Sequence, residues 1–593
     1  MQMTKQSVPS IGERRASLTS QYPVWQSRTL ATHFAIQCDK YRDRPLLFMQ
    51  DQTITYGQMW DRACKIAKAL IFMGVRRREH IAILMSNDPD YIALLIAISL
   101  VGGVAVPLNT MLRFEELNYM LRQSDSNWLF LHQVAGNQNH AKTIEQIVSK
   151  LRAEPENQLK QVICIPNTSE RVSDSFLEWN TFIKNADAVS DDALKVRWDS
   201  SEYPDEVAAI IYTSGSTGLP KGVMMTHNMM LRSGFATCLS RALEDGRRIF
   251  APLPLYHVYF LEEGLLAVSF VGGGMITCLG FSPLLSLELM EKYEANDFLA
   301  VPSMLVSILN HPEVRSFNLS SLYALLCCAA PSPVPLWQMA VDILGVTEIG
   351  TGCGGTEASS TTMLTEIGDP LDIISSRVGK VKRAGAAGLP EFNHASVQYK
   401  VVDPDTGCDL PSGSVGELAV RGNVVTRGYY KKPVETAATI DKDGWLKSGD
   451  LGRIDEQGYI QLLGRSKNLY KVSGETVAPK EVEDVISLHP AVTQVYIVGV
   501  PDALTTETGA AFVELKADSV CSRREIIDWC KSRVARFKVP RYVWFVTADE
   551  WPLTGTGKIQ KFKLQNMAKE RLASRLKDGG TSTKNTKVKQ DRK

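Results

Sequence analysis

Apolar runs of strand length alternate with helical runs along much of the chain, and this alternation constrains the fold more than any other feature. Residues 80–85, 91–100 and 104–108 are predicted to form a strand, a helix and a strand. The same order returns further on, over residues 248–253, 260–271, 275–279, 284–293 and 298–301. Repetition of strand, helix and strand implies parallel sheets covered by helices. The sequence therefore predicts an α/β fold with two related layers.

Other segments of this region carry more local signals. Residues 47–49 and 53–56 flank a polar turn and are predicted to form a hairpin, and residues 57–73 have helical periodicity. The polar section 136–205 has weaker signals, from which we expect surface loops. The uncharged stretches 91–108 and 264–281 approach the length of a membrane span, but glycines interrupt both. We expect each to be a buried helix followed by a buried strand, because a span needs about 20 unbroken apolar residues.

The character of the sequence changes twice toward the carboxyl end. From residue 397 short strands and Gly-containing turns predict a small β-barrel-like section that closes the large domain. Beyond Arg465 follows an α+β pattern, with a helix opened by Pro479, strands at 492–500, 510–515 and 542–546, and a helix at 523–537. A chain of 593 residues exceeds one hydrophobic core. The predicted division is a flexible arm (1–29), a large domain (30–466), a small mobile α+β domain (467–576) and a disordered basic tail (577–593).

Composition excludes several classes of function. The net charge of +1 gives no reason to expect nucleic acid as a partner. The 11 cysteines form no C-x-x-C pair, so neither zinc nor a disulfide framework is indicated. The polar amino terminus lacks the apolar core of a signal peptide. A cytoplasmic protein without an integral membrane segment is expected.

Residues 212–222 form a loop rich in Gly, Ser and Thr behind the apolar run 207–212, which is predicted to be a buried strand. Glycines let backbone N–H groups approach an anion, hydroxyls add donors, and a lysine adds positive charge. The residues concerned are Thr213, Ser214, Gly215, Ser216, Thr217, Gly218 and Lys221. The loop is not a Walker A motif, which needs G-K-[ST] leading into a helix. The sequence predicts a phosphate cradle, and the alternative is a flexible turn that binds nothing.

Four further motifs follow the cradle along the chain. They are Gly352-Cys-Gly-Gly-Thr-Glu357, Ser448-Gly-Asp450 with Arg465, Lys471-Val-Ser-Gly474-Glu475 and Pro552-Leu-Thr-Gly-Thr-Gly-Lys558. Together with the cradle, these motifs resemble the signatures of the adenylate-forming superfamily, which comprises acyl- and aryl-CoA synthetases, luciferases and peptide-synthetase adenylation domains. The resemblance extends from about residue 30 to about residue 572 and is greatest to the acyl-CoA ligases.

The resemblance implies a site for ATP in the large domain. Glu357 would coordinate Mg²⁺, and Thr356 would contact the α-phosphate. Asp450 would accept hydrogen bonds from the ribose hydroxyls, and Arg465 would donate to the ribose. The alternatives are a helix cap for the Thr-Glu pair and a surface ion pair for the other two.

The resemblance also implies a mobile carboxy-terminal domain with a hinge at Lys467. Lys558 would bridge the substrate carboxylate and the α-phosphate during adenylation, and Lys471 would assist thioester formation while Gly474 leaves room for the thiol arm. One domain would thus present two faces in turn. Retention of the Lys471 motif favours a thioester product over a simple adenylate.

Two positions depart from the family pattern. Cys353 stands where an aromatic ring usually packs against adenine, and Asn468 follows the hinge where an acidic residue is usual. The substrate pocket is expected to include His257, Ser303 and Ala329 together with Cys353. Glu262 and Glu263 could face either the pocket or solvent, and solvent is the favoured expectation because charged residues are rarely buried. The amino-acid-activating members of the superfamily hold the substrate ammonium with an aspartate just after the position of His257. No aspartate occurs between residues 254 and 260, so the resemblance argues against an α-amino acid substrate.

The leading hypothesis is an ATP- and Mg²⁺-dependent ligase that joins a fatty or aryl acid to coenzyme A and releases AMP and pyrophosphate. Small-molecule acid, ATP and coenzyme A are then the binding partners. A second hypothesis is an adenylating enzyme that loads the phosphopantetheine of a carrier protein. A third, motivated by Cys353 and Asn468, is a nucleotide-binding member of the family without catalytic activity. The acid and the oligomeric state are left open.

Overall fold

The computed structural model describes residues 8–151, 158–213, 219–328, 332–465, 468–473, 475–502, 504–517, 519–553 and 559–577. The chain divides into two compact units, of which the first comprises Met1–Lys400 and Ala419–Ser448. The second comprises Val401–Leu418 and Gly449–Lys593. Lys467, the expected hinge, lies outside the described residues.

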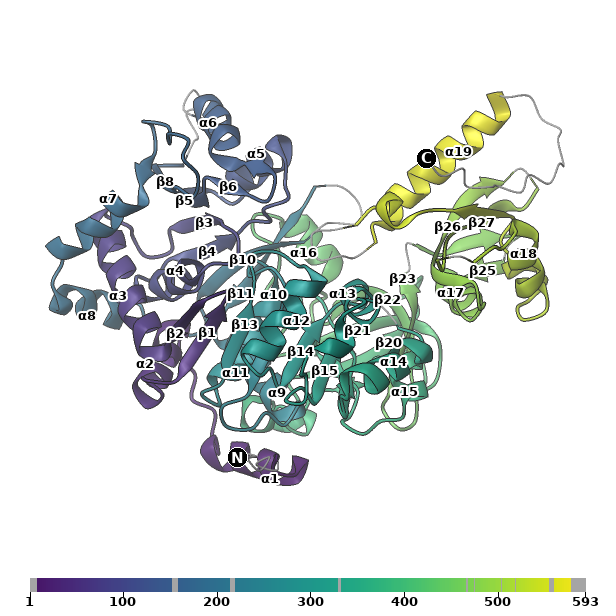
Figure 1. The fold of residues 1–593 in the computed structure, drawn as a ribbon, viewed down its shortest axis with the longest axis horizontal. Coiled ribbons are helices and arrows are strands. Elements are labelled where there is room, and N and C mark those ends of the chain that lie inside the picture. The colour runs from purple at the N-terminus through teal and green to yellow at the C-terminus, as the bar shows by residue number, and fades with distance from the viewer. Residues whose placement is uncertain are drawn as a thin grey trace. The chain divides into compact units, whose positions relative to one another are not determined.

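The first unit contains a mixed sheet that is parallel except at one edge (Figure 1). Within the described residues its strand order is β16-β15-β14-β12-β13-β1-β2. The strands are β1 (Pro45–Met49), β2 (Gln52–Thr55), β12 (Arg248–Phe250), β13 (Gly274–Thr277), β14 (Asp297–Ala300), β15 (Ala324–Cys327) and β16 (Glu348–Gly350). β1 and β2 form the expected hairpin, in which Gln50 takes a positive φ of 53°.

A second sheet of the same kind lies beside the first. Over the described part of the chain its order is β11-β10-β4-β3-β5-β8-β9, parallel except for β11. The strands are β3 (His80–Leu84), β4 (Val104–Pro107), β5 (Ser126–His132), β8 (Gln161–Ile165), β9 (Leu177–Glu178), β10 (Val207–Thr213) and β11 (Lys221–Thr226). The predicted α/β architecture with two related layers is confirmed.

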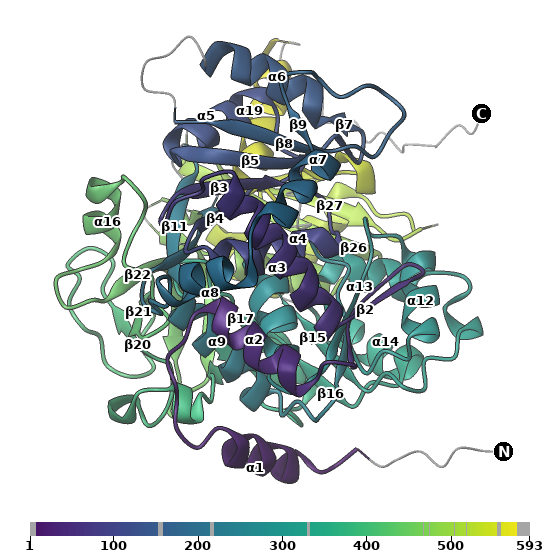
Figure 2. The same ribbon diagram turned by 90° about the vertical axis from the view of Figure 1, so that its left-hand side faces the viewer.

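Helices cover the faces of both sheets, as Figures 1 and 2 show. The longer helices that follow residue 29 in the first unit are α2 (Leu30–Lys40), α3 (Tyr56–Phe72), α4 (Pro89–Leu100), α5 (Phe114–Gln123), α6 (His140–Leu151), α7 (Trp179–Lys184), α8 (Asp191–Asp199), α9 (His227–Ser240), α12 (Pro283–Lys292), α13 (Pro302–Leu309), α14 (Val334–Leu344), α15 (Leu371–Ser376) and α16 (Pro433–Thr439), of which α16 lies away from the two sheets (Figure 2). Their boundaries follow local signals. Asp88 caps α4 ahead of Pro89, and Thr55 and Gln58 form a capping box on α3.

The two uncharged stretches are helix followed by strand, as expected. Helix α4 leads into β4, and the helical run α10 (Val258–Phe260), a π-helix (Leu261–Leu266) and α11 (Ala267–Ser269) leads into β13. Gly102 and Gly272 make the turns with positive φ of 69° and 58°. In the part of the chain that is described, no helix is long and apolar enough to cross a membrane.

The section 136–205 is more regular than the sequence indicates. It supplies helix α6, strand β8 next to β5, and the short helices α7 and α8. The expected surface loops are present, as over the exposed residues 166–171, but the amount of regular structure was not predicted. The polar residues mark the solvent side of amphipathic elements, while Ile144, Ile147 and Ile163 lie fully buried in the core.

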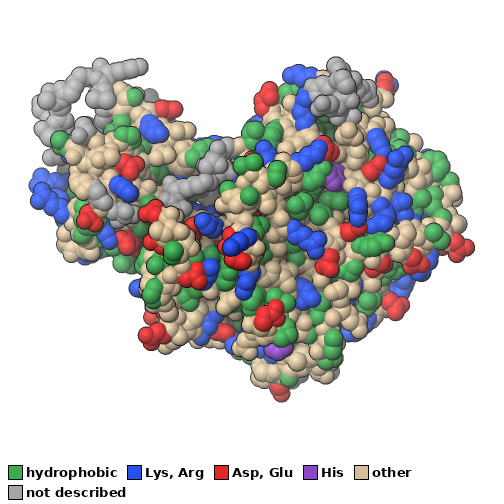
Figure 3. Space-filling model, turned by 180° about the vertical axis from the view of Figure 1, so that it is seen from behind, with side chains coloured by type: hydrophobic (Ala, Val, Ile, Leu, Met, Phe, Trp, Pro, Cys, Tyr) green, Lys and Arg blue, Asp and Glu red, His purple; other side chains and the backbone are tan. Residues whose placement is uncertain are grey.

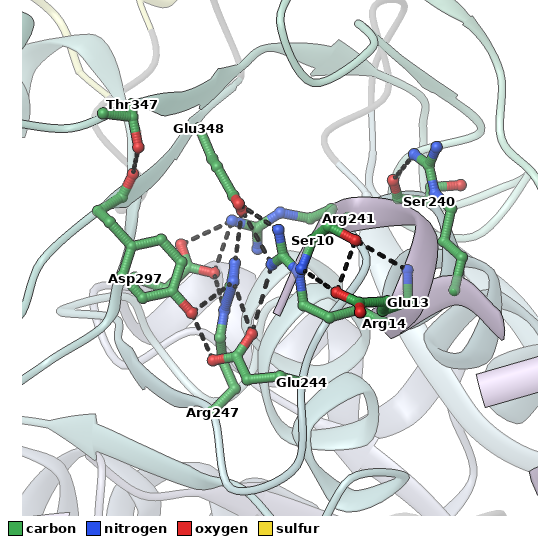
Figure 4. A network of polar contacts seen from close by, with 12 residues as sticks. Ser10, Glu13, Arg14, Ser240, Arg241, Glu244, Arg247, Asp297, Thr347 and Glu348 are labelled. Carbon is green, nitrogen blue, oxygen red and sulfur yellow. Dashed lines mark hydrogen bonds and ion pairs between the residues drawn. The ribbon is translucent and has the colours of Figure 1, made fainter. Parts of the chain in front are cut away.

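Residues 11–21, within the expected flexible arm, form helix α1 (Ile11–Gln21), which Ser10 and Glu13 open with a capping box. In both ribbon views α1 lies at the edge of the first unit (Figures 1 and 2). Figure 4 shows why it is held there: Arg14 points from α1 into a cluster of acids and arginines. Arg14 pairs with Glu348 and lies 3.5 Å from Glu244.

The cluster around Arg14 contains as many acids as arginines, and Arg14, Arg241, Arg247 and Asp297 are buried while Glu244 and Glu348 are partly exposed. Arg247 contacts Glu244, Asp297 and Glu348 at 3.3–3.4 Å. Arg241 makes a two-pronged hydrogen bond to Asp297 at 2.6 and 2.7 Å. Long-range ion pairs of this kind leave no periodic pattern in the sequence, so an apolar-pattern analysis does not detect the docking of α1.

Short strands follow the large sheets. A sheet of order β17-β18-β19 comprises β17 (Gly352–Cys353), β18 (Met363–Leu364) and β19 (Lys380–Val381). A further sheet of order β20-β21-β22-β23 comprises β20 (Val397–Val402), β21 (Gly416–Gly422), β22 (Leu446–Ile454) and β23 (Ile460–Arg465). It occupies the segment in which short strands were predicted.

The carboxy-terminal part is α+β, as predicted. Its sheet has the order β25-β24-β27-β26, with β28 beside β27. The elements are β24 (Tyr470–Val472), β25 (Glu475–Val477), α17 (Pro479–Ser487), β26 (Val492–Asp502), β27 (Thr506–Leu515), α18 (Arg523–Lys531), β28 (Tyr542–Phe545) and α19 (Lys561–Lys577). On the face drawn in Figure 3, acidic and basic side chains are interspersed, in keeping with the net charge of +1.

Candidate active site

The predicted phosphate cradle connects two antiparallel strands at the edge of the second sheet. Strand β10 ends at Thr213, β11 begins at Lys221, and these two residues are register partners across the pair. The intervening Ser214, Gly215, Ser216, Thr217 and Gly218 lie outside the described residues. A strand and not a helix follows the lysine, so the distinction from a Walker A loop is confirmed.

Tyr429 brings the cradle lysine and the predicted metal ligand together. The Lys221 ammonium lies over the Tyr429 ring, 4.1 Å from its centroid. The Tyr429 hydroxyl donates a hydrogen bond of 2.9 Å to Oε1 of Glu357. Lys221 is 208 positions from Tyr429 and 136 positions from Glu357 along the chain, so the sequence gives no local signal of this contact. The fold places all three side chains in the first unit.

The backbone of the same segment is fixed at both sides. The N–H of Thr426 donates to the carbonyl of Glu357 at 2.7 Å, and its hydroxyl donates to the carbonyl of Met224 at 2.7 Å. The N–H of Tyr430 donates to the carbonyl of Gly222 at 2.8 Å. Residues 426–430 thus tie strand β11, directly after the cradle, to the Glu357 loop.

Glu357 offers a single oriented carboxylate as a candidate ligand for a magnesium ion. Its carboxylate is partly buried and oriented by the Tyr429 hydroxyl. The described residues contain no group of three or more His, Cys, Asp or Glu side chains that could hold a metal. Mg²⁺ is commonly held by one or two carboxylates together with substrate phosphates and water. A single oriented carboxylate near a phosphate cradle fits this arrangement, and a dedicated protein cage is not what it indicates.

Glu262 and Glu263 anchor the loop that carries Glu357. Both side chains are fully buried, so the expectation that they face solvent was wrong. Oε2 of Glu262 accepts the Ser360 N–H at 2.9 Å, and Oε1 of Glu263 accepts the Thr361 N–H at 3.2 Å. A π-helix positions them, a form that is rare and often found at functional sites. Burial raises the pKa of Glu262 to about 8.

Lys382 completes this buried polar network. Its ammonium lies 3.0 Å from Oε1 of Glu263, 2.6 Å from the Thr237 hydroxyl and 2.8 Å from the Thr361 carbonyl. The side chain of Lys382 is only 3 % exposed. A buried charge is tolerated when it is paired and hydrogen-bonded, and this lysine is both. The network therefore fixes residues 360–361, which lie three and four positions after Glu357 along the chain.

Asp450 and Arg465, the predicted ribose residues, contact each other in the second unit. They are register partners in the antiparallel pair β22–β23, and Nε of Arg465 lies 2.7 Å from Oδ1 of Asp450. Gly449 precedes Asp450 with a positive φ of 73° and donates its N–H to Glu417 at 3.0 Å. The assignment of Asp450 and Arg465 to a ribose site stays a prediction.

The predicted pocket residues lie on different elements of the first unit. His257 caps α10, where its Nδ1 accepts the Tyr259 N–H at 3.1 Å. Cys353 is half-buried on β17, and Ser303 is half-buried in the first turn of α13. Ala329 lies outside the described residues. The assignment of these four residues to a substrate pocket stays a prediction.

Thr356 and Lys471 have well-defined backbone environments. The carbonyl of Thr356 accepts the Ser359 N–H at 3.2 Å in the turn after Glu357. Lys471 is exposed on β24, and its N–H donates to Glu507 at 2.7 Å. Gly474 and Lys558, like the expected hinge residue Lys467, lie outside the described residues. Their roles also stay predictions.

Sequence reasoning did not identify Tyr429, Lys382 or the roles of Glu262 and Glu263. A Gly-Tyr-Tyr sequence at residues 428–430 is a weak signal, because aromatic pairs more often pack in a core. The adjacent acids on an otherwise apolar helical run are a clearer signal. Charged residues in such a place are buried only when they have partners.

Two family models match the chain. The model of the AMP-binding enzymes matches residues 34–430, and the model of the AMP-binding enzyme C-terminal domain matches residues 481–558. YngI of Bacillus subtilis (strain 168), whose name assigns it to the acyl-CoA synthetases, is 35 % identical over 540 residues, which cover 89 % of this chain and 94 % of that protein. The chain belongs to the AMP-binding enzyme family, and the predicted resemblance is confirmed.

Other relatives are ligases of acids with coenzyme A. A feruloyl-CoA synthase of an Amycolatopsis species is 31 % identical, over 86 % of this chain and 92 % of that one. The solved structure of the anthranilate CoA ligase AuaEII with anthranoyl-AMP is 25 % identical, with a TM-score of 0.79, and covers 94 % of this chain and 99 % of that one. These matches make the chain an AMP-forming acid–CoA ligase, with ATP, coenzyme A and Mg²⁺ as the family's cosubstrates and metal.

Proposed function

We propose that the protein ligates a fatty or aryl acid to coenzyme A in two steps. In the first, a carboxylate oxygen of the acid attacks the α-phosphorus of ATP, which gives an acyl-adenylate and releases pyrophosphate. In the second, the thiol sulfur of coenzyme A attacks the acyl carbon, the thiol proton is lost, and AMP leaves. The observation that carries this proposal is the meeting of Lys221 and Glu357 on Tyr429.

Several of the predicted residues would act in the first step. Lys221 and the cradle residues would hold the β- and γ-phosphates. Glu357 would hold Mg²⁺, which when bound neutralises phosphate charge, and Thr356 would contact the α-phosphate. Lys558 would stabilise the negative charge that develops between the carboxylate and the α-phosphate.

The remaining residues belong to nucleotide binding and to the second step. Asp450 and Arg465 would hold the ribose. After rotation about Lys467, Lys471 would assist the thiol attack, with Gly474 leaving room for the pantetheine arm. The names of the relatives support both substrate classes, since feruloyl and anthranoyl groups are aryl and the Danio rerio relative ACSF2, 28 % identical, is a medium-chain acyl-CoA ligase.

Acid-dependent exchange between labelled pyrophosphate and ATP tests the proposal. A panel of aliphatic and aryl acids is assayed with and without coenzyme A. Exchange with at least one acid, and AMP release on addition of coenzyme A, is the expected result. Exchange without AMP release would favour loading of a carrier protein. No exchange with any acid would favour a nucleotide-binding member of the family without activity.

A further inference from the structure

We propose that Tyr429 is the positioning residue that sets the distance between the phosphate-binding lysine and the metal-binding carboxylate. The inference rests on the proposed function and deepens it. Tyr429 contacts Lys221 through its ring, at 4.1 Å, and Glu357 through its hydroxyl, at 2.9 Å. One side chain therefore orients the two oppositely charged groups on which the first step depends.

The need for such a residue follows from electrostatics. The Lys221 ammonium and the Glu357 carboxylate attract each other. If they formed a direct ion pair, neither charge would be available to a phosphate or a metal ion. Among the ion pairs of the described residues, none joins Lys221 to Glu357. The ring instead receives the ammonium on its face through a cation–π contact. The hydroxyl at the other end holds the carboxylate by a charge-assisted hydrogen bond.

The position of Tyr429 is itself well determined. Tyr429 is only 5 % exposed and lies opposite Val223 in a bridge to strand β11. Its N–H donates to the Thr436 hydroxyl at 3.0 Å. Gly428 precedes it with a φ of 135°, which a side chain there would strain, and an added Cβ would lie 2.5 Å from Thr436. The backbone thus holds the ring beside both strand β11 and the Glu357 loop with little freedom.

Tyr429→Phe isolates the hydroxyl, because the ring and its contact with Lys221 remain. We expect Mn²⁺ bound with ATP, followed by electron paramagnetic resonance, to bind about tenfold more weakly, since a charge-assisted hydrogen bond to the ligating carboxylate is lost. Pyrophosphate exchange should fall by a similar factor through kcat. Tyr429→Leu, which also removes the ring, should in addition raise KM for ATP.

Tyr430→Phe is the matched control. The Tyr430 hydroxyl also donates to a carboxylate, that of Asp125 at 2.7 Å, on the other side of the same segment. This variant should keep wild-type Mn²⁺ affinity. In a Glu357→Gln background, Tyr429→Phe should have little further effect on Mn²⁺ binding, because the Tyr429 hydroxyl acts through the Glu357 carboxylate.

The outcomes separate the inference from the proposed function. If wild-type protein catalyses exchange but Tyr429→Phe binds Mn²⁺–ATP as wild type does, the positioning role is overturned and the ligase function stands. If Tyr429→Phe lowers only the melting temperature and leaves Mn²⁺ affinity unchanged, the residue is structural and the inference is equally overturned. If wild-type protein supports no exchange with any acid, the proposed function fails.

Discussion

Replacement of Glu262 by glutamine should make the protein more stable at alkaline pH. The carboxyl group of Glu262 is fully buried, and burial raises its pKa from the ordinary 4.5 to about 8. Near neutral pH it is therefore a protonated acid that accepts the Ser360 N–H on Oε2. A glutamine side chain has the same shape, one acceptor oxygen and donor hydrogens in place of the acid proton.

The sign and size of the effect follow from proton linkage. Below pH 4.5 both native and unfolded states carry the proton. Between pH 4.5 and about 8 the unfolded state releases it while the native state keeps it, so native stability falls as the pH rises and levels off above about 8. At about 1.4 kcal/mol per pH unit this interval corresponds to roughly 5 kcal/mol as an upper bound. Glutamine does not titrate, so the Glu262→Gln variant does not undergo this decrease in stability.

Urea unfolding of wild type and Glu262→Gln at a series of pH values, from about 5 to about 8.5, measures this difference. The two proteins should have similar free energies of unfolding at the acid end, and the variant should gain several kcal/mol at the alkaline end. Glu263→Gln is the matched control on the adjacent residue. It removes the partner of buried Lys382 and should destabilise at every pH in the range. A stability difference between wild type and Glu262→Gln that does not change with pH would refute the reasoning.

Three further variants test other parts of the structure. Cys353→Tyr should tighten ATP binding about two- to tenfold in calorimetry, because an aromatic stack is worth roughly 0.5–1.5 kcal/mol; unchanged affinity would contradict the stacking argument. Lys558→Ala should slow acyl-adenylate formation by about 10²–10³-fold in pyrophosphate exchange while sparing thioester formation from a supplied acyl-adenylate. Arg14→Met should lower the free energy of unfolding, measured by urea titration, by about 3 kcal/mol, since it breaks a buried ion pair. Arg15→Met is the control and should lower it less, because the pair of Arg15 with Glu366 is more exposed.

The alternating apolar pattern predicted the sheets because buried strands and their covering helices depend on local periodicity. The strand that ends at Thr213, the hairpin around Gln50 and the helix opened by Pro479 lie where expected. Strand β8 and helix α1 were missed for a physical reason. A short strand inside a polar section has too few apolar residues to stand out, and α1 is held by Arg14 through charge pairs that have no period.

The candidate site divides in the same way. The cradle was predicted from its residue types, because phosphate binding favours glycines, hydroxyls and a lysine. The roles of Glu357 and Lys471 were predicted from the family resemblance of their motifs, and they stay predictions. Tyr429 was not found, because its value comes from contacts with Lys221 and Glu357 that are distant in sequence. Glu262 was placed in solvent because an unpaired acid is rarely buried, and its partner, the Ser360 N–H, comes from a remote loop.

The sequence by itself determined the class of fold and the AMP-binding family, and from it the groups that would handle phosphate, metal and thiol were predicted. Side-chain chemistry and apolar periodicity are local properties, and they can be read from the order of residues alone. The tertiary structure alone decided which charges are paired, which acids are buried, and that one tyrosine ring stands between Lys221 and Glu357. Those properties depend on long-range packing, in which burial and a neighbour's charge shift the behaviour of an otherwise ordinary side chain.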